Sequence, residues 1–254
     1  MTTEPADVSS EGSDVFPATL FAPAKLTLSL RITGVRSDGY HLIDAEMVTL
    51  DFGDDLRLSA GDGLEVVDPA TGEPIDIGPP ESNLITRALR TVGRRCSVSV
   101  QKRIPAGAGL GGGSADAAAV LRWAGSTDLD AAARLGADVP FCVIGGRARV
   151  RGIGELIEPL SFRARTFTLW TPPLRCSTPE VYRVWDDLGG PIGDHGNDLE
   201  PAALVVEPRL ADWRDELAAI SGQRPHLAGS GSTWFVEGEY PGDGRVVVRT
   251  TPPL

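Results

Sequence analysis

The segment from Ile104 to Ala118, IPAGAGLGGGSADAA, carries five glycines within positions 107–113. Glycine lacks a Cβ atom, so the backbone N–H groups of such a turn can approach an anion closely. Ser114 is a good N-cap residue, and the sequence after it predicts a helix over 115–124 with Asp116 in its first turn. Because helix N-termini attract anions, we expect this segment to bind the phosphate groups of a ligand.

Other glycine-rich motifs fit the segment less well. A Walker A loop has a lysine directly after its last glycine, and none follows Gly113. Gly107, Gly109 and Gly112 match the G-x-G-x-x-G spacing of a dinucleotide site. However, Ile104-Pro105 precedes them, and no clear acidic residue closes a βαβ unit about 20 positions on. A flexible linker would not lead directly into an apolar helix.

Composition limits the class of protein. A chain of 254 residues, 41% of them hydrophobic, suits one large domain or two small ones, and no apolar run reaches the ~18 residues of a membrane span. The acidic N-terminus is unlike a signal peptide, so we expect a short disordered tail over 1–14 and a cytoplasmic protein. The net charge of −11 argues against nucleic-acid and anionic-membrane partners.

Lysine and the other potential ligand residues are sparse. Of 24 basic residues only Lys25 and Lys102 are lysines, and Lys102 directly precedes the glycine-rich segment. A compact ammonium fits where the fork of a guanidinium does not, so both lysines are candidate site residues. The three histidines form no cluster and the three cysteines lack the spacing of metal ligands, so we expect no dedicated metal site and buried cysteines.

Secondary-structure patterns indicate an α+β chain with strands and helices segregated. In the first half we expect one or two strands over 18–32, a turn at Asp38-Gly39, a strand pair over 42–58 broken at Gly53-Asp54, and a loop with short extended pieces over 59–80. We then expect a helix over 82–92 capped by Ser82, a strand over 97–100, helices over 115–124 and 129–135, and strands within 139–158. In the second half we expect a strand at TFTLW, a helix opened by Pro179, an amphipathic helix ending before Gly222, a glycine–serine turn leading into a strand, and a last strand at RVVVRT. These patterns predict two lobes, over 15–158 and 159–254.

Five segments occur in an order that resembles the GHMP kinases: PAKLTLSL, SDGYH, IPAGAGLGGGSADAA, LGADVPF and AGSGSTWF. The resemblance runs from about Pro23 to Phe235, nearly the whole chain. It implies a fold of two lobes, an N-terminal lobe of the ribosomal-S5-like kind and a C-terminal ferredoxin-like lobe. It also implies that ATP and an acceptor bind in the cleft between them.

Within this family, the combination of PAKL, DGYH and LGADVPF is typical of kinases acting on a cytidine-diphosphate-linked methylerythritol. The resemblance thus implies transfer of the γ-phosphoryl group of Mg²⁺-ATP to the 2-hydroxyl of that acceptor, in non-mevalonate isoprenoid biosynthesis. Mg²⁺ is then expected to be held largely by phosphates. Two alternatives stay open: a family kinase with mevalonate, homoserine or a sugar as acceptor, and a nucleotide-binding relative without turnover.

The resemblance also implies roles for individual residues. Asp138 in LGADVPF matches the general base of the family, and Lys25 in PAKL matches the catalytic lysine. Taken singly, Asp138 could cap a turn and Lys25 could be a strand-edge charge. Expected ATP contacts are Pro105, Ala106, Gly107, Ala108, Gly109, Leu110, Gly111, Gly112, Gly113, Ser114, Asn83 and Lys102. Expected acceptor contacts are Thr27, Tyr40, His41, Thr178, Pro179 and Tyr182.

Three features depart from the family pattern. Thr27 stands where an asparagine commonly follows PAKL, and Ala115 stands where a second serine often follows Ser114. The stretch between the helix after the glycines and LGADVPF is shorter than usual. The glycine–serine turn Gly229–Ser232 could face the cleft or serve only as a hairpin turn. We expect a monomer or a weak homodimer.

Overall fold

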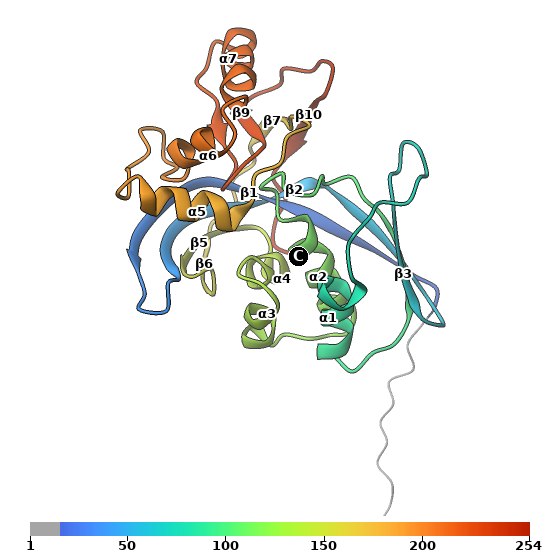
Figure 1. Cartoon of the computed structure of the whole chain (residues 1–254). Helices are drawn as coiled ribbons and strands as arrows, with labels where there is room; N and C mark the ends of the chain where they lie inside the picture. The colour runs from blue at the N-terminus through green and yellow to red at the C-terminus, as the bar shows by residue number, and fades with distance from the viewer. Residues whose placement is uncertain (1–15) are drawn as a thin grey trace, which may run out of the picture.

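The computed structural model describes residues 16–254 and consists of two lobes (Figure 1). The tail predicted over 1–14 lies outside the described residues. One lobe is built on a six-stranded sheet and the other on a four-stranded sheet, each with helices against it. The predicted α+β class is therefore confirmed.

The sheet of the first lobe is largely antiparallel. Its strands are β1 (Ala18–Val35), β2 (His41–Ser59), β3 (Gly63–Val67), β4 (Ser97–Gln101), β5 (Arg147–Gly152) and β6 (Leu156–Leu160). They lie in the order β3-β4-β2-β5-β6, and β1 pairs with β2. Only β3 and β4 run parallel among the pairs of this sheet.

The long hairpin of β1 and β2 corrects the prediction of a break at Gly53-Asp54. Strand β2 is continuous, and Gly53 lies opposite Pro23 of β1. A Cβ atom at Gly53 would lie 2.3 Å from the carbonyl oxygen of Ala22, so glycine here permits a close strand approach. The glycine at position 53 is explained by this close approach of the two strands, and not by a turn of the chain.

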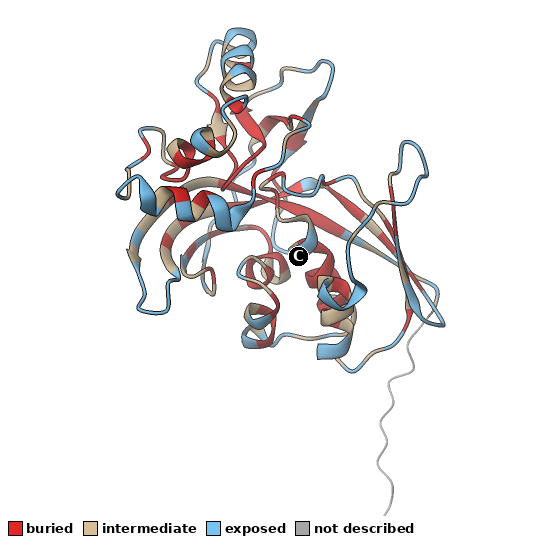
Figure 2. Cartoon of the chain, viewed as in Figure 1, coloured by how far each residue is buried: buried red, intermediate tan, exposed pale blue. Residues whose placement is uncertain are grey.

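The helices α1 (Leu84–Thr91), α2 (Gly112–Trp123), α3 (Leu129–Leu135) and α4 (Val139–Ile144) belong to the first lobe, and a short 3₁₀ helix (Pro80–Ser82) precedes α1. In Figure 1 they gather on one side of its sheet. Helix α2 supplies small side chains, with Ala115 and Ala117 to Ala119 all buried, so it can lie close to the sheet. Figure 2 shows this buried layer between helices and strands.

Three predictions about these helices were wrong. The cap of α1 is Asn83, whose Oδ1 accepts from the N–H of Ile85 at 2.9 Å, and not Ser82. Helix α2 begins at Gly112, because Gly111 takes a left-handed conformation with φ of 69°, so Ser114 lies inside the first turn. Residues 139–144, read as strand from their apolar run, form α4, with Pro140 in its first turn, where a missing N–H costs nothing.

The second lobe contains a four-stranded sheet in the order β10-β7-β9-β8. Its strands are β7 (Thr166–Trp170), β8 (His226–Leu227), β9 (Trp234–Glu237) and β10 (Arg245–Arg249). Its helices are α5 (Thr178–Asp187), α6 (Glu200–Val206) and α7 (Leu210–Ser221). The sequence patterns did not predict α6. The indole N–H of the fully buried Trp234 donates to the carbonyl of Leu210, which ties α7 to β9.

The two lobes hold one another at several points. The carbonyl of Gly196 and the N–H of Asp198 bond to the backbone of Leu30 in β1, and Arg31 pairs with Asp198 at 2.6 Å. The end of the chain returns to the first lobe, where the N–H of Leu254 bonds to the carbonyl of Ile144 (Figure 1). None of the helices within 16–254 is long and apolar enough to cross a membrane. The predicted lobe boundary after residue 158 stays a prediction.

The close approach of β1 and β2 predicts that Gly53→Ala lowers the free energy of unfolding by about 1–3 kcal/mol. The added methyl group would overlap the backbone of Ala22 and Pro23, so the two strands would have to separate. Chemical denaturation of both proteins measures the difference. Gly34→Ala is the matched control, because its new Cβ would lie 3.8 Å from the nearest atom. Equal stability of both variants would contradict the prediction.

Candidate active site

The glycine loop, defined as residues 105–114, lies where the two lobes meet. A Cβ atom at Gly109 would lie 2.1 Å from the carbonyl oxygen of Ala228 in the second lobe. At Gly111 it would lie 2.7 Å from Cγ of Lys25 in the first lobe. Both glycines also have positive φ values, 77° and 69°. Glycine is therefore required at these positions by the contacts as well as by the backbone conformation.

Backbone hydrogen bonds fix this loop to both lobes. The N–H groups of Ser232 and Thr233 donate to the carbonyls of Gly107 and Ala108, at 3.1 and 3.2 Å. On the other side, the N–H of Lys25 donates to the carbonyl of Leu110 at 3.1 Å. The glycine–serine turn therefore does face the glycine loop. With the carbonyls engaged, the N–H groups that open α2, at positions 112–114, are free of helical partners and can receive an anion.

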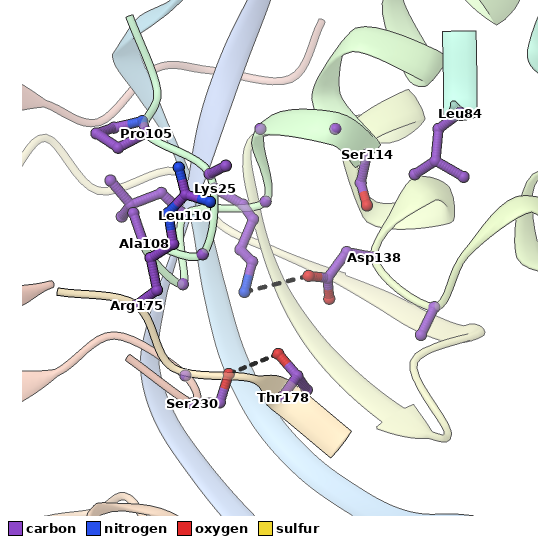
Figure 3. A pocket seen from close by; sticks show the side chains of 18 of the residues that line it. Lys25, Leu84, Pro105, Ala108, Leu110, Ser114, Asp138, Arg175, Thr178 and Ser230 are labelled. Atoms are coloured by element: carbon purple, nitrogen blue, oxygen red, sulfur yellow. Dashed lines mark hydrogen bonds and ion pairs between the residues drawn. The ribbon is translucent and has the colours of Figure 1, made fainter. Parts of the chain in front are cut away.

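Lys25 and Asp138 form an ion pair beside the glycine loop, with Nζ to Oδ2 at 3.2 Å (Figure 3). The Lys25 ammonium also donates to the hydroxyl of Thr27 at 3.1 Å. The side chain of Lys25 is 7% exposed and that of Asp138 is 30% exposed. Asp138 precedes α4, yet its carboxylate makes no capping hydrogen bond. Both side chains line the cavity, and the Asp138 carboxylate is not used to cap the start of α4.

The direction of Lys25 and Thr27 follows from the strand that carries them. Residues two apart on a strand point to the same face. The register of β1 with β2 shifts between Pro23 and Lys25 and again between Thr27 and Ser29. Such bulges bend a strand and redirect its side chains, often next to a functional site. The short piece of β1 between the two bulges thus presents both polar side chains to the glycine loop.

A second, more buried charge cluster lies on the other side of the glycine loop. The ammonium of Lys102 contacts Asp54 at 2.5 Å and Asp116 at 2.7 Å. Asp54 is fully buried, and its other oxygen accepts from the N–H groups of Arg103 and Ile104. Because those two residues lead into the glycine loop, Asp54 fixes the start of the loop. Asp116, expected in the first turn of this helix, lies in the second turn of α2 and is buried.

Burial raises the pKa of Asp116 to about 7, with the Lys102 charge opposing the shift and the Asp54 charge adding to it. The Oδ1 atom of Asp116 is buried and has no hydrogen-bond partner in the described part of the chain. An unpartnered buried oxygen disfavours the ionised form of a carboxyl group. Lys102 thus lies between one fully bonded carboxylate and one that titrates near neutral pH.

An aromatic cluster forms where the β1–β2 hairpin meets α5. The ring of His41 lies 4.7 Å from that of Tyr182 and 5.5 Å from that of Trp185, centre to centre. Its Nε2 atom is 2.9 Å from a carboxylate oxygen of Asp186. Burial, with the Asp138 charge adding, raises the pKa of Tyr182, so its hydroxyl stays protonated. Tyr40 differs from this cluster, because it is 59% exposed and lies against Arg36.

Thr178 opens α5 close to the glycine–serine turn. Its hydroxyl lies 2.8 Å from that of Ser230, and Figure 3 shows the two side chains meeting across from the Lys25–Asp138 pair. Pro179 lies in the first turn of α5, as expected. The N-terminus of α5 and the turn thus form one wall, contributed by the second lobe.

Every residue expected to act in catalysis or to contact ATP or the acceptor lines one cavity of about 1680 Å³, from Lys25 through the glycine loop and Asn83 to Asp138 and Tyr182. The structure thus brings all of them together, while their individual roles stay predictions. Sequence reasoning missed Asp54, the burial of Asp116, the pairing of His41 with Asp186, and Arg175. The scarcity of lysine was the signal available for the Asp54–Lys102–Asp116 cluster. Among residues 16–254 no group of three or more His, Cys, Asp or Glu side chains is suited to hold a metal.

Comparisons with known proteins agree with this geometry. The family "GHMP kinases N terminal domain" matches residues 83–146. A 4-diphosphocytidyl-2-C-methyl-D-erythritol kinase of Ruegeria pomeroyi is 36% identical, over 88% of this chain and 89% of that protein. One of Paracoccus denitrificans is 38% identical, over 84% of each. A crystal structure of a 4-(cytidine 5'-diphospho)-2C-methyl-D-erythritol kinase matches with a TM-score of 0.71 and 30% identity, over 92% of this chain and 99% of that one.

The raised pKa of Asp116 predicts how stability changes with pH. An unfolded aspartate titrates near pH 4, so between about pH 4 and 7 the folded state binds more protons than the unfolded state. The free energy of unfolding contributed by this group therefore falls as pH rises, and levels off above pH 7. Relative to Asp116→Asn, we expect the wild type to lose about 2 kcal/mol between pH 5 and 7.

Urea denaturation at several pH values measures that difference. Asp243→Asn is the control, because it makes the same substitution at an aspartate that is exposed. Parallel profiles for the wild type and Asp116→Asn would show that Asp116 ionises normally in the folded protein.

Proposed function

This chain belongs to the family of 4-diphosphocytidyl-2-C-methyl-D-erythritol kinases, and on that premise we propose that it transfers the γ-phosphoryl group of ATP to the 2-hydroxyl of 4-diphosphocytidyl-2-C-methyl-D-erythritol. The observation that supports this most is the Lys25–Asp138 pair at 3.2 Å. It lies in the same cavity as the glycine loop and as the aromatic cluster of His41 and Tyr182. A phosphate donor and a nucleoside-linked acceptor can therefore meet at one carboxylate.

In the proposed reaction Asp138 accepts the proton of the acceptor hydroxyl as its oxygen attacks the γ-phosphorus. Lys25 orients that hydroxyl and offsets the negative charge that develops on the transferred group. The hydroxyl of Thr27 accepts a hydrogen bond from the Lys25 ammonium at 3.1 Å, and so helps to hold it beside Asp138. A threonine hydroxyl performs this holding role with a shorter reach than the asparagine common in the family. The glycine loop holds the ATP phosphates through its N–H groups.

Mg²⁺ is part of the proposal, since ATP-dependent kinases use it to neutralise phosphate charge. It keeps several waters and is bound through one or two protein groups together with substrate phosphates. The Ser114 hydroxyl fits this pattern, because Ser114 lies in the first turn of α2 and lines the cavity. Ala115, which stands where the family often has a second serine, is fully buried and offers no oxygen.

The acceptor side follows from the aromatic cluster. We assign the cytosine ring to the space beside His41 and Tyr182. If His41 donates its Nε2–H to Asp186, its Nδ1 atom becomes an acceptor, which suits the exocyclic amino group of cytosine. Tyr182 contributes a ring face for stacking. Thr178, Pro179 and the exposed Tyr40 border the same space.

Asn83 and Lys102 occupy the donor side of the proposal. The side-chain oxygen of Asn83 accepts the capping hydrogen bond of α1. The side-chain N–H₂ group of Asn83 is thus left for the adenine side of the cavity. The ammonium group of Lys102 lies next to Gly112. A Cβ atom added at Gly112 would lie 2.9 Å from Nζ of Lys102. The cytoplasmic location and the monomeric or weakly dimeric state stay predictions.

Turnover with defined acceptors tests the proposed function. With ATP and Mg²⁺ the purified protein should release ADP in the presence of the cytidylyl acceptor, and far more slowly with mevalonate, homoserine or galactose. Asp138→Asn should lower kcat by about 10²- to 10⁴-fold, because the general base is lost, while ADP affinity measured by calorimetry stays unchanged. ATP binding without turnover on any acceptor would instead identify a nucleotide-binding relative.

Acceptor recognition is tested separately by the KM for the cytidylyl acceptor. We expect His41→Ala and Tyr182→Ala each to raise this KM by about tenfold, through loss of a hydrogen bond and of a stacking face, with little effect on the KM for ATP. Tyr182→Phe keeps the ring and His195→Ala alters a histidine outside the cavity, so both should resemble the wild type. An unchanged acceptor KM in both alanine variants would contradict cytosine recognition.

A further inference from the structure

Arg175 differs from the other cations of the cavity. Each of the others is paired with a carboxylate: Lys25 with Asp138, Lys102 with Asp54 and Asp116, Arg103 with Asp55, and Arg183 with Asp187. In the described part of the chain Arg175 forms no ion pair, although it lines the cavity and is exposed. Its charge is therefore available to a ligand without first breaking a contact within the protein.

The backbone around Arg175 is firmly held even though its side chain is not. The carbonyl of Leu174 accepts from the Ser232 hydroxyl at 2.7 Å. On the other side of Arg175, Cys176 is buried, and its Sγ lies 3.3 Å from the position of a Cβ atom on Gly231. Both neighbours are thus anchored to the glycine–serine turn. Because that turn also bonds to the glycine loop, Arg175 has a fixed origin beside the loop.

The side chain of Arg175 extends along the glycine loop. Its Cβ and Cγ atoms lie 3.6 and 3.7 Å from the position that a Cβ atom of Gly107 would occupy. In the view of Figure 3 the side chain of Arg175 extends beside the glycine loop. Aliphatic stems commonly lie on the protein surface while the charged end stays accessible. The guanidinium group of Arg175 therefore extends beside the glycine loop and does not point away from it.

The acidic side chains around the cavity make an unpaired cation useful for binding an anionic ligand. Asp138, Asp54 and Asp116 line or border the cavity, and the whole chain carries −11. Under the proposed function, on which this inference rests, both ligands carry a diphosphate group. The cations that are already paired have part of their field cancelled by their carboxylates. An unpaired guanidinium is suited to a diphosphate, because its planar fork can bond two oxygens at once.

We propose that Arg175 is a ligand-binding residue of the second lobe whose guanidinium binds a diphosphate group lying on the glycine loop. The loop of the first lobe thus provides N–H groups on one side of the diphosphate, and Arg175 provides a charge from the other. Its position beside Gly107 favours the diphosphate of ATP. The acceptor diphosphate is the alternative source of the same chemistry.

The test uses Arg175→Gln, Arg175→Lys and the control Arg163→Gln. Arg163 is exposed, forms no ion pair in the described chain and lies outside the cavity, so its replacement removes the same charge elsewhere. Calorimetry without acceptor gives the Kd for ADP, and steady-state assays give the KM for each substrate. We expect Arg175→Gln to raise the Kd for ADP and the KM for ATP about tenfold, through loss of a charge-assisted hydrogen bond. Arg175→Lys should retain part of the affinity, and Arg163→Gln all of it.

The two substrates distinguish the source of the diphosphate. A rise confined to the KM for the cytidylyl acceptor would place the acceptor diphosphate on Arg175, and would still support the proposal. If Arg175→Gln matches Arg163→Gln in all three quantities, the proposal is wrong. Thermal denaturation checks that the variants remain folded. Should the wild type fail to turn over any acceptor, the proposed function would fail, while the Kd for ADP would still decide the role of Arg175.

Discussion

The glycine loop can lie between the two lobes only because the loop residues that contact the lobes are glycines, which lack a Cβ atom. Gly109 lies against the backbone of Ala228 and Gly111 lies against the stem of Lys25, at distances that no other residue allows. The same close contact permits the N–H groups of Ser232 and Thr233 to bond to the loop. The loop therefore joins the two lobes as well as being the proposed phosphate-binding surface, and a shift of either lobe would alter the shape of the cavity.

Charge pairing organises the space around that loop. Lys25 and Asp138 leave the pair partly open to the cavity, with the carboxylate the more exposed partner. Lys102 lies deeper and is held by two carboxylates, one of which also fixes the backbone that enters the loop. Buried charges are tolerated only when they are paired and hydrogen-bonded, so the second cluster is best understood as structural support. In the first cluster the Asp138 carboxylate lines the cavity and is 30% exposed, so it is accessible to a bound ligand.

The proposed acceptor side is made from segments that are far apart in the sequence. The β1–β2 hairpin of the first lobe brings His41 to α5 of the second lobe, where Tyr182, Trp185 and Asp186 surround it. Thr178 at the start of α5 bonds to the glycine–serine turn. Because that turn also holds the glycine loop, the donor and acceptor sides share one support.

The sequence alone determined the family, the α+β class and a core group of the residues that line the cavity, because the glycines, Lys25 and Asp138 occur in short contiguous motifs. It did not determine features set by contacts between distant segments. Gly53-Asp54 resembles a turn locally, but pairing with β1 keeps β2 a continuous strand through it. The apolar run at 139–144 suits a strand, but it forms α4, with Pro140 in the first turn. Asp116 and Arg175 have no local signature, because burial, pairing and the lack of a partner exist only once the lobes are assembled.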